Sequence, residues 1–147
     1  MENIFETFTI TILKLNKLVQ KIKVAEMEKY GLKAVHVMCI YYLKKAPEGL
    51  TARELTKLTL EDKAAISRAL SKLKDCGYIT YDHEGYNAGI RLTEEGAILA
   101  DTVAVMSESA VKACNGVLTD EERAHFYGLL EKIAESLTVY YEKLIKE

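Results

Sequence analysis

The feature that most restricts the fold of this chain is a pair of helix-start signals within residues 51–76. Thr51 and Glu54 form a capping box, in which each side chain accepts the backbone N–H of the other residue. A connection of about three residues, Thr59 to Glu61, separates this first helix from Asp62, a good N-cap for a second helix. Two short helices joined in this way predict a helix-turn-helix motif.

The second of these helices is predicted to be amphipathic and to end at Gly77. Its apolar positions recur at helical spacing: Ile66, Ala69, Leu70 and Leu73. The first helix should turn Leu55 and Leu58 inward. The opposite face of the second helix offers phosphate contacts and one base-contacting arginine through Lys63, Ala64, Ser67, Arg68, Ser71 and Lys72. Small residues on this face favour DNA contact over an ordinary solvated surface, since they let a helix enter a major groove about 12 Å wide.

Helical and strand patterns flank this motif on both sides. A near-heptad spacing predicts a first helix to about Glu28, with apolar positions Ile4, Phe8, Ile12, Leu15, Val19 and Ile22. A second helix is expected from Leu32 to about Lys45, ahead of a loop containing Pro47 and Gly49. After Gly77, the runs 78–81 and 90–92 flank a glycine-containing loop and predict a β-hairpin.

Two further helices complete the chain. Thr93 caps a helix that ends near Asn115. Its expected apolar positions are Ile98, Val103, Met106, Ala110 and Cys114. A second capping box, Thr119 with Glu122, starts the last helix. Its apolar positions are Phe126, Leu130, Ile133, Leu137, Tyr140 and Leu144. The fold class is therefore mostly α with a small β-hairpin.

Size and composition favour one cytoplasmic domain that is not an enzyme. The 147 residues, 49% of them hydrophobic, suffice for one core, and no apolar run reaches the length of a membrane span. The three cysteines lack metal-ligand or disulfide spacing, and Cys39 and Cys114 are expected in the core. The three histidines lack pairwise spacing, so no metal and no cofactor is predicted. Motifs of nucleotide-binding and hydrolytic enzymes are absent from the sequence.

Charge is unevenly distributed along the chain. Residues 1–50 hold eight Lys and Arg against five Asp and Glu, and residues 51–76 hold six against four. Residues 77–147 hold six against thirteen, which brings the net charge to -2. Because the chain is not basic overall, it would bind DNA through a local face, and electrostatic attraction would contribute only modestly to the binding free energy.

The segment from Gly49 to Ile79, the hairpin and the following IRLTEEG resemble the MarR family of bacterial transcription regulators. The most specific similarities are Leu73, Gly77 and Ile79 at the end of the second short helix, and Leu92, Thr93 and Gly96 after the hairpin. The resemblance covers essentially the whole chain. It implies a single domain, 1–147, with a winged helix-turn-helix at 32–93 and dimerisation helices at 1–30 and 116–147.

The resemblance also implies partners and a mechanism. A homodimeric repressor would place two recognition helices in successive major grooves of a pseudo-palindromic operator in double-stranded DNA. Besides the recognition helix, the residues contacting DNA would be Arg53, Lys57 and Arg91. A small ligand between the dimerisation lobe and the DNA-binding lobe would control the spacing of the two recognition helices. Family members commonly carry arginines at the tip of the hairpin, the wing. Here the tip has Glu84, Gly85 and Tyr86, so either the wing stands off the DNA or neutral contacts form there.

Tyr30, His36, Tyr41 and Tyr42 on or near the second helix suggest a site for a small aromatic ligand, although such tyrosines also occur as core-edge residues. Two other functions remain open. One is a winged-helix protein-interaction module that has lost DNA binding, which the acidic balance and the cation-poor wing favour. The other is a metal or redox sensor on the same scaffold.

Overall fold

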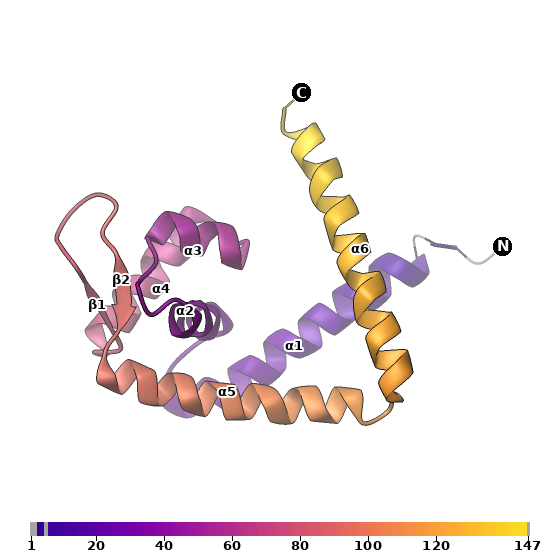
Figure 1. The fold of residues 1–147 in the computed structure, drawn as a ribbon, viewed down its shortest axis with the longest axis horizontal. Helices are drawn as coiled ribbons and strands as arrows, with labels where there is room; N and C mark the ends of the chain where they lie inside the picture. The colour runs from indigo at the N-terminus through magenta and orange to yellow at the C-terminus, as the bar shows by residue number, and fades with distance from the viewer. Residues whose placement is uncertain (1–2, 5, 147) are drawn as a thin grey trace. The chain divides into compact units, whose positions relative to one another are not determined.

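The computed structural model of the chain describes residues 3–4 and 6–146 (Figure 1). Residues 1–2, 5 and 147, which belong to the predicted terminal helices, lie outside the described residues. The chain forms two compact units, Met1–Ser107 and Glu108–Glu147. None of the helices in the described ranges is long and apolar enough to cross a lipid bilayer.

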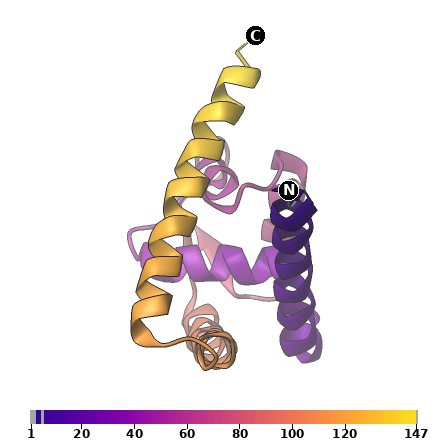
Figure 2. The same cartoon turned by 90° about the vertical axis from the view of Figure 1, so that its right-hand side faces the viewer.

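The first unit begins with a long helical segment. A π-helical stretch, Glu6–Ile10, leads into α1 (Thr11–Met27), and a 3-10 turn, Glu28–Tyr30, follows it. The next helix, α2 (Ala34–Lys45), runs steeply across α1, as Figure 2 shows. The end of α1 and both ends of α2 match the sequence prediction within about two residues, because periodicity and Gly31 mark these limits, whereas Glu6–Ile10 is π-helical and not part of one continuous α-helix.

α2 lies at the centre of the hydrophobic core. Its Cys39, Ile40 and Leu43 are almost fully buried, and the helix packs against α1, α3 (Ala52–Thr59), α4 (Lys63–Asp75) and the hairpin. Full burial of an aliphatic side chain such as Ile40 contributes about 1.5–3 kcal/mol. The other elements supply the remaining core side chains: Met27, Leu32, Leu55, Ile66, Ala69, Leu70, Leu73, Ile79, Ile90, Leu99, Ala100 and Val103.

The hairpin is short and is attached to the loop before α3. β1 (Ile79–Tyr81) pairs antiparallel with β2 (Ile90–Leu92), with Thr80 opposite Arg91. Leu50 forms an isolated bridge to Ile90 through two backbone hydrogen bonds of 3.0 and 2.8 Å. The base of the hairpin is thereby held against the helix-turn-helix.

The turn between α4 and β1 also starts the next helix. Gly77 has a φ of 77°, which a left-handed C-cap requires, and the Tyr78 N–H donates to the Leu73 carbonyl at 3.0 Å. The Thr93 hydroxyl donates to the Gly77 carbonyl at 2.6 Å and accepts the Gly96 N–H at 3.0 Å. Thr93 therefore caps α5 (Glu94–Asn115) and ties it to the end of α4.

Three apolar positions differ from the sequence prediction. Leu58 is 44% exposed, because α3 is short and turns only Leu55 fully into the core. Ile98 is 64% exposed, since α5 approaches the hairpin through Gly96 and so buries Leu99 and Ala100 instead. Cys114 is exposed, as it lies on the part of α5 after Val103 in which no residue is buried.

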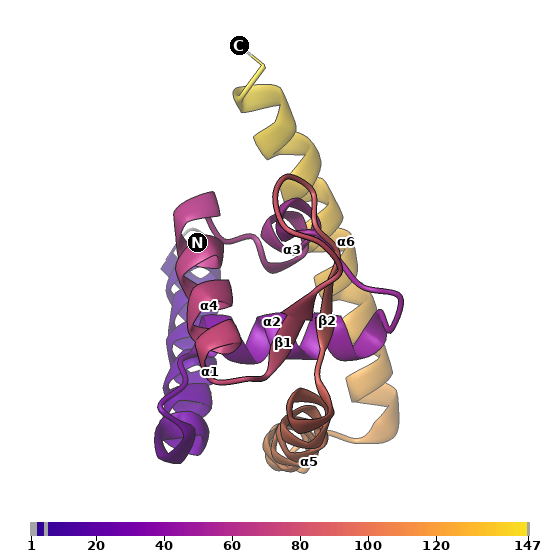
Figure 3. The ribbon, with the colours of Figure 1, turned by 90° about the vertical axis from the view of Figure 1, so that its left-hand side faces the viewer.

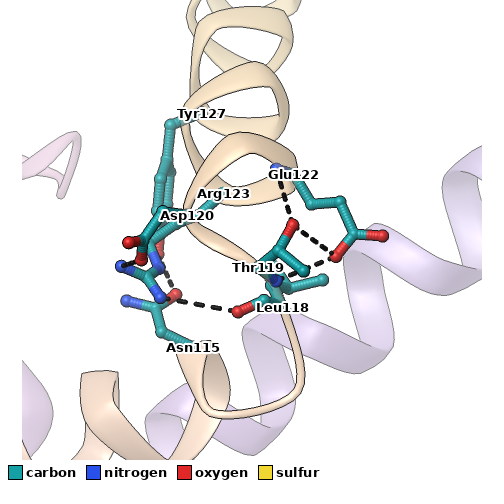
Figure 4. A network of polar contacts seen from close by, with 7 residues as sticks. All are labelled: Asn115, Leu118, Thr119, Asp120, Glu122, Arg123 and Tyr127. Carbon is teal, nitrogen blue, oxygen red and sulfur yellow. Dashed lines mark hydrogen bonds and ion pairs between the residues drawn. The ribbon is translucent and has the colours of Figure 1, made fainter.

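The second unit contains the end of α5 and α6 (Asp120–Leu144). The predicted capping box is present: the Thr119 hydroxyl accepts the Glu122 N–H at 3.2 Å, and the Glu122 carboxylate accepts the Thr119 N–H at 2.8 Å. Figure 4 shows this box beside an Arg123–Asp120 ion pair of 3.1 Å. A hydrogen bond of 3.0 Å from the Tyr127 hydroxyl to Asn115 spans the turn. These contacts fix the α5–α6 turn.

α6 buries none of its side chains. Its exposed apolar and aromatic residues include Phe126, Leu129, Ile133, Leu137, Tyr140 and Leu144. The π-helical stretch and α1 resemble it, with exposed residues that include Phe8, Ile12, Leu15, Val19 and Ile22. Apolar rows of this length are unusual on the surface of a monomer.

Candidate nucleic-acid interface

α4 has one buried face and one polar, exposed face. Its buried residues are Ile66, Ala69, Leu70 and Leu73. All six residues predicted to contact DNA are exposed: Lys63, Ala64, Ser67, Arg68, Ser71 and Lys72. The Asp62 side chain accepts the Ala65 N–H at 2.7 Å, which confirms the predicted N-cap and fixes where the helix starts.

The chemistry of this face suits a nucleic-acid groove. Long cationic side chains alternate with alanine and serine, so the helix backbone is free to come close to a surface between the cations. An arginine donates two parallel hydrogen bonds to a guanine edge, whereas lysines and serines bind phosphate oxygens. The thirteen residues of α4 hold four cations and one acid, and three of the cations, Lys63, Arg68 and Lys72, supply a local positive surface on a chain with a net charge of -2.

α3 adds two exposed cations, Arg53 and Lys57. The Thr51–Glu54 capping box holds the start of this helix: the Glu54 carboxylate accepts the Thr51 N–H at 2.7 Å. This hydrogen bond, together with one from the Thr51 hydroxyl, holds the pKa of Glu54 below its usual value. Glu54 therefore stays ionised near the N-terminus of α3, where a negative charge is favourable.

A hollow of about 590 Å³ separates the helix-turn-helix from the wing. No local sequence pattern indicates this hollow, because it depends on how the hairpin packs. The helices line it with Thr51, Ala52, Arg53, Thr56, Lys63, Ile66, Ser67 and Leu70. The hairpin lines it with Tyr81, Gly85, Tyr86, Asn87, Ala88 and Ile90. Arg53 and Lys63 thus share one concave surface with the wing tip.

Asp82 organises the wing tip, residues 82–89. Its carboxylate accepts the Gly89 N–H at 2.8 Å and lies 2.6 Å from Nδ1 of His83. Nε2 of His83 lies 3.2 Å from the Tyr86 carbonyl oxygen. The Gly89 hydrogen bond holds the pKa of Asp82 below its usual value, and His83 acts in the same direction. A β-carbon at residue 89 would lie 2.5 Å from the Asp82 carboxylate, so a larger residue there would force the Asp82 side chain to shift.

Arg91 lies at the base of the wing and not at its tip. Its Nε donates to the Glu48 carbonyl oxygen at 3.0 Å, which ties β2 to the loop before α3. Tyr86, by contrast, is 89% exposed at the tip. The side chains that the tip presents to a neighbouring surface are therefore acidic, aromatic, amide or imidazole groups.

The four residues suggested for a small ligand are placed differently from one another. His36 is buried, and its Nδ1 accepts the Lys33 N–H at 2.7 Å, which supports the start of α2. Tyr41 and Tyr42 pack edge to face with ring centroids 5.2 Å apart, and the Lys45 ammonium lies 4.7 Å from the Tyr41 ring. Tyr30 packs on the core after α1. The hollow beside the wing is lined by none of the four.

The three cysteines have different surroundings. Burial raises the pKa of the Cys39 thiol to about 12, so this residue stays a neutral core side chain. Cys76 is half-buried and Cys114 is exposed. Within the described ranges of the chain, no three His, Cys, Asp or Glu side chains are grouped so that they could hold a metal ion.

Comparison with known proteins identifies solved structures with the same fold as this chain. The sequence model of the MarR family matches residues 30–85. No functionally curated protein matches the chain. A MarR transcriptional regulator from Methanosarcina mazei Go1 shares 22% identity with a TM-score of 0.82, covering 91% of this chain and 92% of that chain.

Two further solved structures are similar. A MarR/EmrR family regulator from Acinetobacter sp. ADP1 has 25% identity and a TM-score of 0.79, covering 92% of this chain and 98% of that chain. The S. aureus MepR–DNA complex has 17% identity and a TM-score of 0.80, covering 88% of this chain and 97% of that chain. These matches confirm the predicted winged helix-turn-helix and the resemblance to the MarR family.

Proposed function

Because residues 30–85 match the MarR family and the chain has the fold of its solved members, we propose that this protein is a DNA-binding transcription regulator. The observation that carries the proposal is the exposed face of α4, where Lys63, Arg68 and Lys72 alternate with small residues. Arg68 contacts a guanine edge, while the lysines and serines of this face bind phosphates. The fold similarity to a protein bound to DNA supports this assignment.

Arg53 and Lys57 on α3 extend the phosphate contacts in this proposal, and Arg91 contributes from the base of the wing. Arg53 and Lys63 line the same hollow, so a single backbone segment would meet both. Arg91 keeps its outer guanidinium nitrogens available, because the hydrogen bond to Glu48 uses only Nε.

The finer proposal is a homodimer, formed by residues 1–30 and 116–147 around the winged helix-turn-helix at 32–93, with 1–147 acting as one functional domain. The support for dimerisation is the long apolar rows that α1 and α6 leave exposed. A two-fold dimer would bind a pseudo-palindromic site with half-site centres about one helical turn apart. Repression controlled by a small aromatic ligand near Tyr30, His36, Tyr41 and Tyr42 completes the proposal.

The test is binding to double-stranded DNA from upstream of the chain's own coding sequence, measured against salt concentration. We expect specific binding whose log K falls linearly with log salt, since each phosphate contact releases a counterion. A duplex of scrambled sequence and the same length is the control. Absence of binding to either duplex at low salt would reject the DNA-binding function and favour the protein-interaction module, which the acidic residues 77–147 and the cation-free wing tip support.

A further inference from the structure

We propose that protonation of His83 offsets the negative charge of the wing tip, so that the protein binds DNA more tightly as the pH falls from about 8 to about 6. This inference rests on the DNA-binding function proposed above. It assigns His83, which none of the sequence arguments identified as a charged group, a role in contact with the duplex.

The wing tip lies beside the proposed DNA-binding face. The tip and the N-terminal half of α4 line the same hollow, with Tyr86 and Asn87 on one wall and Lys63 and Ser67 on the other. Figure 3 shows the hairpin loop beside α3, at the end of the hairpin away from α5. A duplex bound to the start of α4 therefore reaches the tip.

Without a charge on His83, the tip repels such a duplex. Residues 82–89 contain no lysine or arginine, and Asp82 and Glu84 give this loop a charge of -2. Asp82 stays ionised, because the Gly89 N–H and His83 both stabilise its carboxylate. The nearest cations across the hollow, Arg53 and Lys63, belong to the helices and not to the wing.

The contacts of the His83 ring suit its protonated form. Nδ1 faces the Asp82 carboxylate at 2.6 Å and Nε2 faces the Tyr86 carbonyl oxygen at 3.2 Å. Both partners are acceptors, but a neutral imidazole has only one N–H to donate. The imidazolium donates to both, and it lowers the charge of the tip from -2 to -1. Besides Asp82, the titratable groups of the loop are Glu84 and Tyr86, and a nearby phosphate would favour the imidazolium further.

His83 is accessible to this phosphate. Its side chain is 53% exposed, and the loop around it is held by the Asp82–Gly89 contact, so protonation changes charge without unfolding the tip. The wing thereby gains a charge that depends on pH where arginine would give a permanent one.

The experiment measures affinity for the upstream duplex and for a short duplex of mixed sequence between about pH 6 and pH 8 at constant ionic strength. The wild type is compared with His83→Gln, which stays neutral, and His83→Lys, which stays charged. His125→Gln on the exposed surface of α6 is the matched control for the loss of a histidine. Circular dichroism at each pH checks that every variant is folded. Proton uptake on binding is measured by calorimetry in buffers of different ionisation enthalpy.

We expect wild type and His125→Gln to bind about five-fold more tightly at the lower pH, the effect of one exposed charge contact, and to take up protons on binding. His83→Gln should show neither effect, and His83→Lys should bind tightly at both pH values. If the wild type binds DNA but His83→Gln keeps the same pH dependence and proton uptake, the His83 proposal is wrong and the DNA-binding function stands. If no variant binds either duplex at any pH, both proposals are wrong.

Discussion

A β-carbon on Gly96 would lie 1.9 Å from the carbonyl oxygen of Tyr78, because α5 starts directly against the residue that precedes β1. The same carbonyl accepts the Thr93 N–H at 3.0 Å, so it is held in place. Any side chain at residue 96 must displace backbone on one of the two elements. The glycine in the L-T-x-x-G segment thus has a packing role that joins the wing to α5.

Gly96→Ala should lower the free energy of unfolding by about 3 kcal/mol, since added atoms in a packed contact force backbone shifts. Urea denaturation followed by circular dichroism measures the change. Gly128→Ala is the matched control, because nothing lies within 4 Å of a β-carbon there and alanine favours helix. Equal stability of Gly96→Ala and wild type would contradict the close contact.

Arg68→Ala should weaken binding to the specific duplex by about 1–3 kcal/mol and reduce the preference over scrambled DNA, because an arginine–guanine contact carries sequence information. Lys72→Ala should weaken binding to both duplexes alike and lower the salt slope by about one. A titration of each variant at several salt concentrations separates these effects. An unchanged sequence preference in Arg68→Ala would contradict the role of this arginine.

Glu84→Arg should tighten DNA binding at low salt, because it replaces an acid at the wing tip with a permanent cation. The plot of log K against log salt should steepen by about one unit for each phosphate contact that forms. Glu131→Arg makes the same change of charge on α6, which carries none of the residues proposed to contact DNA, and should leave the slope unchanged. A wing that stands off the DNA would give identical slopes for both variants.

Acid should destabilise the fold through His36. Burial lowers the pKa of this residue, and the charges of Lys33 and Lys72 lower it further. Because the unfolded chain takes up the proton first, this contribution is complete above about pH 6.5 and is lost as the pH falls toward the folded-state value. Protonation at Nδ1 would also remove the acceptor for the Lys33 N–H.

Urea denaturation at about pH 7.5 and pH 5.5 tests this contribution. The wild type should lose stability between the two values, whereas His36→Gln, which keeps an acceptor without titrating, should lose less. His125→Gln should behave as the wild type. A pH dependence identical in wild type and His36→Gln would show that His36 is not the responsible group.

A negative charge in the apolar row of α6 should prevent dimerisation, since burial of an unpaired carboxylate is costly. Leu137→Glu is expected to be monomeric by light scattering at a concentration where the wild type has twice the mass of one chain. Glu131→Gln, also on the exposed surface of α6, should remain dimeric. A wild type with the mass of a single chain would reject the homodimer.

Much of the secondary structure was predictable because its signals are local. The capping boxes at Thr51 and Thr119 and the N-cap at Asp62 are satisfied within three residues of chain, so no tertiary contact is needed to recognise them. The two faces of α4 followed from the spacing of its apolar residues, which is a property of the helix itself.

The direction in which α5 turns its side chains was decided by tertiary structure. Ile98 and Leu99 are adjacent apolar residues, and periodicity alone does not distinguish which one faces the core. The contact of Gly96 with Tyr78 does, because it fixes the rotation of the helix. The exposure of Leu58 has a similar origin, since it depends on how far α3 reaches beyond Leu55.

The sequence by itself determined the order of elements, the helix ends and the cationic face, because these depend on residues close together along the chain. Tertiary structure decided the hollow between α4 and the wing and the hydrogen bond that ties Arg91 to Glu48. Each of these joins groups whose distance is set by how the hairpin folds back, and no local pattern encodes that distance.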